Sequence, residues 1–292
     1  MAHGSSHLAS VIIPAHNEQA VLDRCLSTLL GDVAPGELDV VVVANACSDA
    51  TARVARSHSV RVVETAVAGK PFAMRLGDDV ALAYPRIYLD ADVELTTGAV
   101  RALVDTVSAS GVLAASPVPE YDLSGVRPIA RRLHKVHRLL MSDRRGLAGA
   151  GVYCLNRDGH SRVAPFPDVI SDDGYVHRSF NPEERVVAAR ARSVVRPAPT
   201  FASSVRRRVR VRQGNRQLDA MGLSLDEGRL GLGALGRLLR LRQVTIADAA
   251  LYLAYIAADR GVVWWQNLRG SDVSWGTDTR SRHGSGPIDG GN

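Results

Sequence analysis

The chain has 292 residues, of which 46% are hydrophobic, 23% charged and 5% aromatic. This composition is typical of a globular protein and excludes a collagen, a coiled coil or a wholly disordered chain. The 36 basic and 30 acidic residues give a formal net charge of +6. That excess is too small to indicate a nucleic-acid-binding protein by itself, but it suits an anionic substrate or an acidic membrane surface.

The cysteines and the apolar segments indicate the cellular compartment of the protein. Cys25, Cys47 and Cys154 are widely spaced and form no Cys-x-x-Cys pair, which argues against a disulfide framework or a zinc site and is typical of a reducing cytosol. The most hydrophobic run, residues 249–258, is too short to cross a bilayer, since crossing takes about 20 apolar residues. The N-terminus lacks the features of a signal peptide. We therefore expect a cytoplasmic protein.

Strands and helices are expected to alternate in the first part of the chain. After a flexible start over residues 1–9, short apolar runs alternate with segments of helical periodicity. The expected strands cover residues 10–13, 39–43, 60–63 and 86–89. The expected helices are one that starts at residue 18 and those over residues 48–57, 71–83 and 97–108. Because the connections are short, the pattern indicates an α/β fold with a mostly parallel, Rossmann-like central sheet flanked by helices.

The alternation breaks after an expected strand over residues 112–116. Residues 117–128 are rich in Pro, Gly and Asp, and a basic helix is expected over 127–141. A strand is expected over 152–155, after a cluster of glycines that includes Gly149 and Gly151. The chain from 203 to 265 is expected to be mainly helical. Residues 276–292 contain little to bury, which predicts a flexible tail.

Polar residues follow three of the expected strands. In a parallel α/β sheet ligands bind at the carboxyl ends of the strands, so these positions are candidates for a binding site. They are Asn17 and Glu18 after the first strand, Asn45, Ser48 and Asp49 after the second, and Asp90 and Asp92 after the fourth. For Asn17 and Glu18, and for Ser48 and Asp49, the simpler interpretation is a helix N-terminus.

Asp90 and Asp92 form the most informative pair. On an extended strand their side chains would point the same way, roughly 6–7 Å apart along the chain, and would repel each other unless a cation lies between them. Mg²⁺ or Mn²⁺ takes one or two protein carboxylates and completes its shell with water and substrate phosphates. We therefore expect a metal on Asp92 that bridges to a diphosphate, with Asp90 on the metal or on a sugar hydroxyl. The alternative is a solvated turn, which Asp also favours.

Two further segments carry candidate functional side chains. Lys70 opens an expected helix after Gly69, where its ammonium group would meet a phosphate or would simply lie at the surface. The segment Ser171-Asp172-Asp173 is typical of a helix N-terminus with two acids in the first turn. The same placement would hold a carboxylate rigidly, as a general base requires. His177 lies four residues after Asp173, where it would orient that carboxylate, bind the metal, or serve only packing.

A dense run of arginines lies between residues 206 and 216. Its interpretations are a solvated helix face, a nucleic-acid patch, or partial neutralisation of a leaving diphosphate by forked hydrogen bonds. No aromatic residue is interleaved with the arginines, which weakens the nucleic-acid interpretation.

Taken in chain order, these segments resemble the family 2 glycosyltransferases of GT-A fold. The first four matching pieces, which are fairly specific, are residues 11–18, 43–51, 69–70 and 89–93. The glycines ending at Gly151, the acidic pair Asp172-Asp173 and residues 213–216 follow, so the resemblance covers about residues 10–217. It implies a catalytic domain over residues 10–220, with a nucleotide-binding half (10–116) and an acceptor half (117–220), followed by a helical extension (221–275).

The resemblance also implies roles for individual residues. Members of the family use a nucleotide-sugar donor and a divalent metal, and they invert the anomeric centre. The donor would be held by Pro14, Ala15, Asn17, Glu18, Asn45, Ser48, Asp49, Lys70, Asp90, Ala91, Asp92, Arg212 and Arg216. The metal would be bound by Asp92, with Asp90 and His177 as further candidate ligands. Asp173 would be the catalytic base, and Gly149, Gly151 and Asp172 would face the acceptor.

The chain departs from the family pattern at three places. The second strand ends in Ala44-Asn45 where many members have an acid, and the family's Glu-Asp pair is Asp172-Asp173. The Gln-x-x-Arg-Trp motif of processive synthases is present only as residues 213–216 followed by Gln217, so a processive synthase is not expected.

The resulting prediction is a metal-dependent, inverting transferase that uses Mn²⁺ or Mg²⁺ and moves one sugar from a nucleotide diphosphate sugar to a hydroxyl acceptor. The acceptor would be a glycan, a lipid-linked molecule or a small molecule. One alternative is a sugar-1-phosphate nucleotidyltransferase, although no Gly-rich phosphate loop follows the first strand. Another is a non-catalytic module that binds nucleic acid or membrane through residues 206–216. A nucleic-acid partner is not expected.

The C-terminal region predicts a further partner, an anionic membrane surface. Leucines are mixed with arginines over residues 235–242, and Trp264 and Trp265 end an apolar helix. Basic residues with flanking tryptophans are typical of an interfacial helix, which would place the protein peripherally on the inner face of the cell membrane. The alternative is that Leu235, Leu238, Leu239 and Leu241 pack on the catalytic domain.

Overall fold

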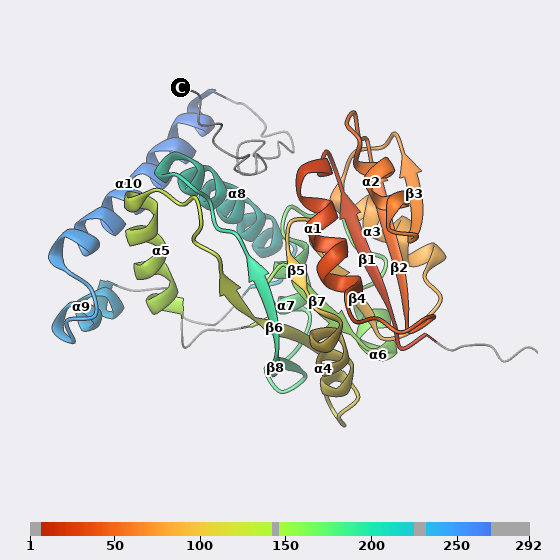
Figure 1. The fold of residues 1–292 in the computed structure, drawn as a ribbon. Coiled ribbons are helices and arrows are strands. Elements are labelled where there is room, and N and C mark those ends of the chain that lie inside the picture. The colour runs from red at the N-terminus through yellow and green to blue at the C-terminus, as the bar shows by residue number, and fades with distance from the viewer. Residues whose placement is uncertain (1–6, 142–145, 225–231, 270–292) are drawn as a thin grey trace, which may run out of the picture. The chain divides into compact units, whose positions relative to one another are not determined.

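The computed structural model describes residues 7–141, 146–224 and 232–269 (Figure 1). Most of the expected flexible start and all of the expected tail, with the side chains of Trp264 and Trp265, lie outside the described part. The chain divides into two compact units. The sheet unit contains residues 7–121 and 146–195, and the helical unit contains residues 122–141, 196–224 and 232–269. This division does not coincide with the expected boundary at residue 220, because two helices that precede it group with the C-terminal ones.

The sheet unit has eight strands in the order β3-β2-β1-β4-β7-β6-β8-β5. They are β1 (Ala9–Ala15), β2 (Leu38–Asn45), β3 (Arg61–Thr65), β4 (Arg86–Leu89), β5 (Glu94–Leu95), β6 (Ala114–Tyr121), β7 (Val152–Leu155) and β8 (Arg185–Val195). The first four strands in chain order pair in parallel, as do β6 and β8. β7 is antiparallel to β4 and β6, and β5 is antiparallel to β8. The expected α/β fold with a mostly parallel sheet is confirmed.

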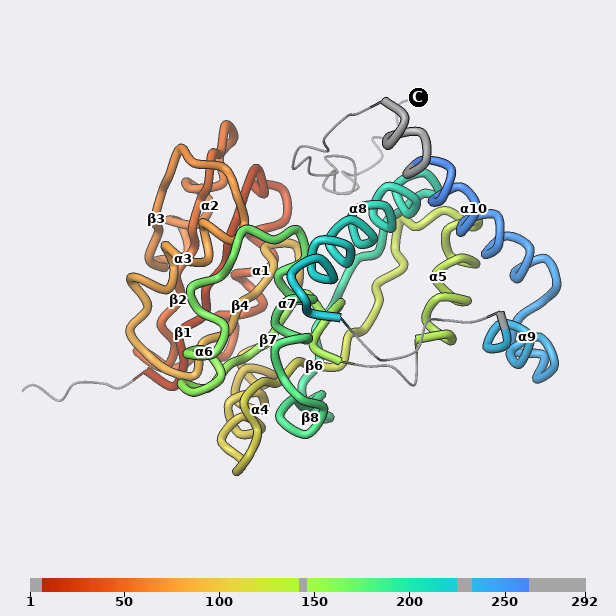
Figure 2. The backbone as a smooth tube through the Cα atoms, turned by 180° about the vertical axis from the view of Figure 1, so that it is seen from behind, coloured from red at the N-terminus to blue at the C-terminus, as the bar shows by residue number. Residues whose placement is uncertain are grey.

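Helices cover both faces of this sheet. α1 (Gln19–Leu30), α2 (Thr51–Ser57) and α4 (Thr97–Val107) contribute to the core on one face. α3 (Lys70–Val80), α6 (Arg157–Val163) and α7 (Asp172–Arg178) contribute to the other, and Figure 2 brings α6 and α7 to the front. The valine run of β2 serves both cores, because Val40 and Val42 pack on one face and Val41 and Val43 on the other.

Two segments differ from the expected pattern. β6 continues through Pro117 and Pro119, where a loop was expected, and its register with β8 shifts between Pro117 and Val118. A bulge of this kind tolerates a residue without a backbone N–H. β8 was not expected, and Arg190 and Arg192 interrupt its apolar residues.

The helical unit consists of α5 (Pro128–Met141), α8 (Phe201–Ala220), α9 (Leu232–Arg240) and α10 (Ile246–Arg269). The helical C-terminal extension is therefore present. Leu235 and Leu238 of α9 are buried in this unit's own core, at 6% and 8% exposure. Those leucines are thus not free to enter a membrane as the sequence suggested. Among the described residues, no helix combines the length and the hydropathy needed to cross a bilayer.

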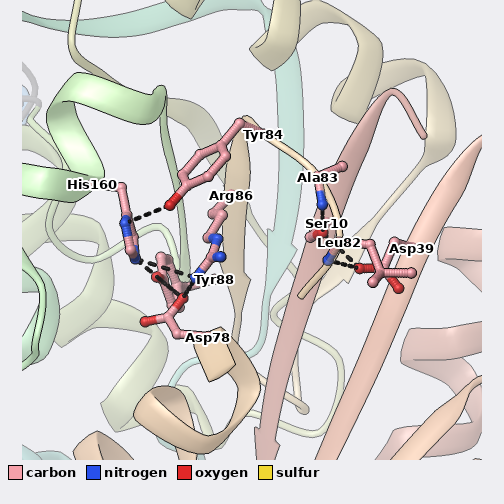
Figure 3. Close-up of polar contacts among 9 residues, drawn as sticks. All are labelled: Ser10, Asp39, Asp78, Leu82, Ala83, Tyr84, Arg86, Tyr88 and His160. Carbon is pink, nitrogen blue, oxygen red and sulfur yellow. Dashed lines mark hydrogen bonds and ion pairs between the residues drawn. The ribbon is translucent and has the colours of Figure 1, made fainter. Parts of the chain in front are cut away.

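Polar side chains form hydrogen bonds and ion pairs near the amino ends of the strands (Figure 3). Asp39, at the start of β2, accepts hydrogen bonds from Ser10 Oγ at 2.6 Å and from the Leu82 N–H at 2.8 Å, and it pairs with Arg61 Nε at 2.9 Å. These contacts tie the loop after α3 to the amino ends of the strands.

A second cluster forms around Asp78, which accepts from Arg86 and from the Tyr88 hydroxyl, both at 2.6 Å.

We expect Asp39→Ala to lower the free energy of unfolding by about 3 kcal/mol, because the buried Ser10 hydroxyl, the Leu82 N–H and Arg61 lose their acceptor. Urea denaturation measures this change. Asp23→Ala is the matched control, since the Asp23 side chain is 71% exposed, and it should leave stability unchanged. Equal stability of both variants would contradict the assigned role.

The contribution of Asp39 should also depend on pH. Burial raises the pKa of this carboxyl, but the hydrogen bonds from Ser10, Leu82 and Arg61 outweigh burial and lower it. A lowered folded-state pKa stabilises the fold above the unfolded value of about 4 and loses that effect as pH falls further. The stability difference between the natural protein and Asp39→Ala should therefore narrow below about pH 4.

Candidate functional site

A hollow lies at the carboxyl ends of β1 and β4 in the sheet unit. It is lined by Pro14, Lys70, Tyr88, Leu89, Asp90, Gly151, Tyr153, Asp172 and Asp173. Six of these nine residues are sequence-predicted site residues, namely Pro14, Lys70, Asp90, Gly151, Asp172 and Asp173. The carboxyl end of a strand in such a sheet is where ligands bind, so this hollow is the candidate active site.

Lys70 lies between two carboxylates of the hollow. Its Nζ is 2.6 Å from Asp90 Oδ1 and 2.8 Å from Asp172 Oδ1. Lys70 is the first residue of α3, while Asp90 follows β4 and Asp172 opens α7. The ammonium group therefore joins three segments that are distant in the sequence. Burial disfavours its charge, but Asp172 and Asp90 outweigh burial and raise the pKa of Lys70.

Asp172 and Asp173 occupy the first turn of α7, as the sequence predicted. Ser171 is the N-cap, and its Oγ accepts from the Gly174 N–H at 3.2 Å. Asp172 is 5% exposed and accepts from the Tyr153 hydroxyl at 3.2 Å. Asp173 accepts from the Gly174 N–H at 2.7 Å and from the Gly149 N–H at 2.9 Å. Both carboxylates are therefore held in fixed positions.

The two neighbouring aspartates differ in proton affinity. Burial and the nearby charges of Asp173 and Asp90 raise the pKa of Asp172, although Lys70 opposes them. Burial also acts on Asp173, but Lys70 and the hydrogen bonds from Ser171, Gly149 and Gly174 outweigh it and lower the pKa of that carboxyl. Asp173 is thus the carboxylate of the pair with the lower proton affinity.

The geometry of Asp90 and Asp92 corrects one expectation. β4 ends at Leu89, and a turn closed by the Val93 N–H on the Asp90 carbonyl follows at 3.0 Å. The two aspartates therefore do not lie on an extended strand. Asp90 lines the hollow, whereas Asp92 is exposed at the turn and is not among the lining residues.

The donor set of this turn fits a divalent cation that shares its shell with substrate. Within the described residues, no three His, Cys, Asp or Glu side chains are grouped to hold a metal. Mg²⁺ or Mn²⁺ needs only one or two protein carboxylates when phosphates and water supply the rest. Asp92 has an exposed carboxylate, and that of Asp90 is 38% exposed. These two residues would hold the ion.

His177 does not join these carboxylates. It is 7% exposed, its Nδ1 accepts from the Leu147 N–H at 3.2 Å, and its ring contacts Arg185. Its ring packs against Gly146 and Arg185. These contacts do not support the expected role of His177 as a metal ligand, which stays a prediction.

The loops after β1 and β2 are joined by hydrogen bonds. Asn17, at φ 54°, accepts from the Ser48 N–H at 2.8 Å and does not cap α1. Asp49 accepts from the Gln19 N–H at 3.2 Å. Asn45 is 1% exposed, donates to the Ala15 carbonyl at 2.9 Å and accepts from the Gly69 N–H at 3.2 Å. Binding of a nucleoside by these residues stays a prediction, and their observed role is to fix the loops.

The arginines predicted to meet a diphosphate belong to the helical unit. Arg212 and Arg208 pair there with Asp259, which is fully buried. Arg216 is exposed on α8. Contact of Arg212 and Arg216 with a diphosphate stays a prediction.

The sequence did not reveal two tyrosines of the hollow. Tyr88 and Tyr153 are directly opposed in the β4–β7 register, and their rings stack with centroids 5.0 Å apart. Each lies in a short apolar run with nothing to mark it as functional. Only the antiparallel pairing brings them together.

We expect Lys70→Met to lower the free energy of unfolding by about 1–3 kcal/mol, because Asp172 stays buried without its counter-charge. Adding Asp172→Asn should recover part of the loss, since the double variant has no uncompensated charge. Urea denaturation measures both. Arg56→Met, which removes a surface pair with Glu64, is the control and should leave stability unchanged. A double variant no more stable than Lys70→Met would contradict the assigned coupling.

Comparison with known proteins gives the family. The model of glycosyl transferase family 2 matches residues 10–160, just over half of the chain. Glycosyltransferase AglE of Haloferax volcanii is 24% identical over 222 residues, which cover 72% of this chain and 73% of that protein.

Two solved structures share the fold. The mannosyltransferase PcManGT from Pyrobaculum calidifontis, in complex with GDP-Man and Mn²⁺, has a TM-score of 0.59 at 18% identity and covers 91% of this chain and 77% of its own. Glucosyl-3-phosphoglycerate synthase from Mycobacterium tuberculosis, with Mn²⁺, UDP-glucose and glycerol 3-phosphate, has a TM-score of 0.52 at 18% identity and covers 75% of this chain and 81% of its own. Together with the extent of the family match, this likeness shows that the chain is a glycosyltransferase of GT-A fold and belongs to glycosyl transferase family 2.

Proposed function

We propose that the chain is a metal-dependent, inverting glycosyltransferase that moves one sugar from a nucleotide diphosphate sugar to a hydroxyl group. The observation that carries the proposal is the meeting of Asp90, Asp172 and Asp173 around Lys70 in one hollow at the carboxyl ends of β1 and β4. The GDP-Man, UDP-glucose and Mn²⁺ complexes of the structural neighbours support the donor class and the metal.

Asp173 serves as the base in this proposal. Its lowered pKa keeps it deprotonated near neutral pH, ready to take the proton of the acceptor hydroxyl. The hydroxyl oxygen then forms a bond to the anomeric carbon from the face opposite the diphosphate. The bond from that carbon to the diphosphate oxygen breaks, and the nucleoside diphosphate leaves. Attack from the opposite face inverts the anomeric centre.

The other residues of the hollow position the reactants. Asp90 and Asp92 would hold Mn²⁺ or Mg²⁺, which supplies Lewis-acid stabilisation of the leaving diphosphate when bound. Asp172, anchored by Lys70 and Tyr153, would orient the acceptor together with Gly149 and Gly151. The acceptor is a glycan, a lipid-linked molecule or a small molecule with a free hydroxyl.

A peripheral position on the inner, anionic face of the cell membrane belongs to the same proposal. This position is supported by the many arginines of the helical unit. Three of the exposed arginines lie on α8, namely Arg206, Arg207 and Arg210. A cationic surface attracts anionic lipid headgroups.

We expect Asp173→Asn to lower turnover by roughly 10²–10⁴ while leaving donor affinity unchanged, because the amide cannot accept the proton. Nucleoside diphosphate release and calorimetric titration with the donor measure the two quantities. Asp172→Asn is the matched control and should cost less in turnover. If Asp173→Asn turns over normally while Asp172→Asn is inactive, the base is Asp172.

We expect Asp92→Ala to abolish the Mn²⁺-dependent part of donor binding. Calorimetric titration of UDP- and GDP-sugars, with and without Mn²⁺, measures this part. Asp105→Ala removes another exposed carboxylate of the sheet unit and should bind the donor normally. Donor binding that is independent of Mn²⁺ in the unaltered chain would contradict the proposed metal site.

A further inference from the structure

α10 has an unusual distribution of side chains between its two faces. The inner face carries Asp248, Tyr252, Tyr255 and Asp259, at 4%, 3%, 8% and 0% exposure. Asp248 pairs with Arg132 Nε at 2.6 Å, and Asp259 pairs with Arg208 Nε at 3.0 Å. Both acids of the stretch 232–262 are thus buried and neutralised inside the helical unit.

The outer face of the same helix is apolar. Ile246 is 82% exposed and Leu253 is 43% exposed, and Ala250 and Ala257 are exposed at helical spacing beside them. We call these four residues the outer stripe of α10, the long blue helix of Figure 1. A helix at a protein surface normally turns its apolar side inward and its charged side outward. α10 also packs apolar side chains inward, but it buries both of its acids and leaves aliphatic side chains exposed on the outer side. Exposed aliphatic side chains that share one helix face indicate a contact surface.

Over the described residues 232–262, the charged side chains that are exposed near the stripe along the chain are arginines. Leu241, at 58% exposure, precedes it on the connection from α9, between the exposed Arg240 and Arg242. Arg260 is exposed at the other end. Over the described residues 232–262, every acidic side chain is buried, so exposed aliphatic groups are flanked by arginines and by no exposed acid.

We propose that the outer stripe of α10, with Leu241, seats the helical unit on an anionic membrane surface. Aliphatic side chains of an interfacial helix enter the boundary between headgroups and acyl chains, and flanking arginines bind lipid phosphates. A second copy of the chain fits less well. A two-fold contact would place the stripe on itself and bring the arginines of one copy against those of the other.

This surface shares Leu241, Arg240 and Arg242 with the one that the sequence indicated, but its other residues differ. Leu235 and Leu238 of α9 fill the core of the helical unit, whereas Ile246 and Leu253 are exposed. The assignment builds on the proposed membrane position and is independent of the transfer chemistry. Failure of the vesicle experiment below would leave the assays of Asp173 and Asp92 variants unaffected.

The test is cosedimentation of the full chain with vesicles of phosphatidylcholine alone or mixed with phosphatidylglycerol. We expect binding to the mixed vesicles and not to the neutral ones. Ile246→Ser combined with Leu241→Ser should weaken binding by at least about tenfold, because two inserted aliphatic side chains are lost. Arg240→Gln combined with Arg242→Gln should weaken it by about tenfold and make the remaining binding less sensitive to salt.

Matched controls come from the sheet unit. Val67→Ser with Leu82→Ser removes aliphatic side chains that are 52% and 67% exposed, and Arg53→Gln with Arg190→Gln removes two exposed arginines. Both control variants should bind vesicles as the unaltered chain does. All variants should release nucleoside diphosphate from the donor at the unaltered rate, which shows that they are folded.

Three results would overturn the proposal. The first is mixed-vesicle binding that the Ile246→Ser, Leu241→Ser variant retains in full. The second is a dimer in sedimentation velocity that this variant dissociates, because a second copy would then cover the stripe. The third is DNA binding that is tighter than vesicle binding and depends on Arg240 and Arg242 but not on Ile246.

Discussion

The ammonium group of Lys70 allows three carboxylates to share one hollow. Asp90, Asp172 and Asp173 would repel one another without a cation among them, and Asp172 is almost fully buried. Lys70 provides that cation from the first turn of α3 and contacts two of the three directly. The rest of the site depends on this arrangement, because it sets the separation between the turn after β4 and the start of α7.

The carboxylates at the two ends of the sheet differ in how completely they are paired with cations and hydrogen-bond donors. At the amino ends, Asp39 and Asp78 each have cationic and hydroxyl partners; Asp39 is buried and the Asp78 side chain is 11% exposed. At the carboxyl ends, Asp92 is exposed and Asp90 is partly exposed. Charges that are fully paired within the protein stabilise the fold, whereas exposed carboxylates remain able to bind a ligand. The hollow thus lies at the end of the sheet where the carboxylates are not fully paired within the protein.

Much of the sheet unit was predictable from local patterns. The apolar run over residues 39–43 predicted β2, and the helical periodicity after residue 18 predicted α1. Ser171 predicted the start of α7 and with it the position of Asp172 and Asp173. These signals are local, because helix caps and hydrophobic periodicity act within a few residues.

What the sequence could not predict depends on contacts between distant segments. The bridge from Lys70 to Asp172 and the stacking of Tyr88 on Tyr153 require the sheet order. The turn after Leu89 was missed because Asp-x-Asp is compatible with an extended strand and with a turn. The leucines of α9 showed an amphipathic pattern, which does not distinguish packing in a protein core from insertion into lipid.

The antiparallel alignment of β4 with β7 pairs Tyr88 with Tyr153 and Leu89 with Val152. Since neighbouring residues of a strand face opposite sides of the sheet, sliding β7 by one position would place Cys154 or Val152 where Tyr153 now lies. The phenol would then turn to the far side, and Asp172 would lose its hydroxyl donor. The register of β7 against β4 is thus part of the chemistry. A single-residue insertion in β7 would disable the hollow although every residue that lines it would keep its identity.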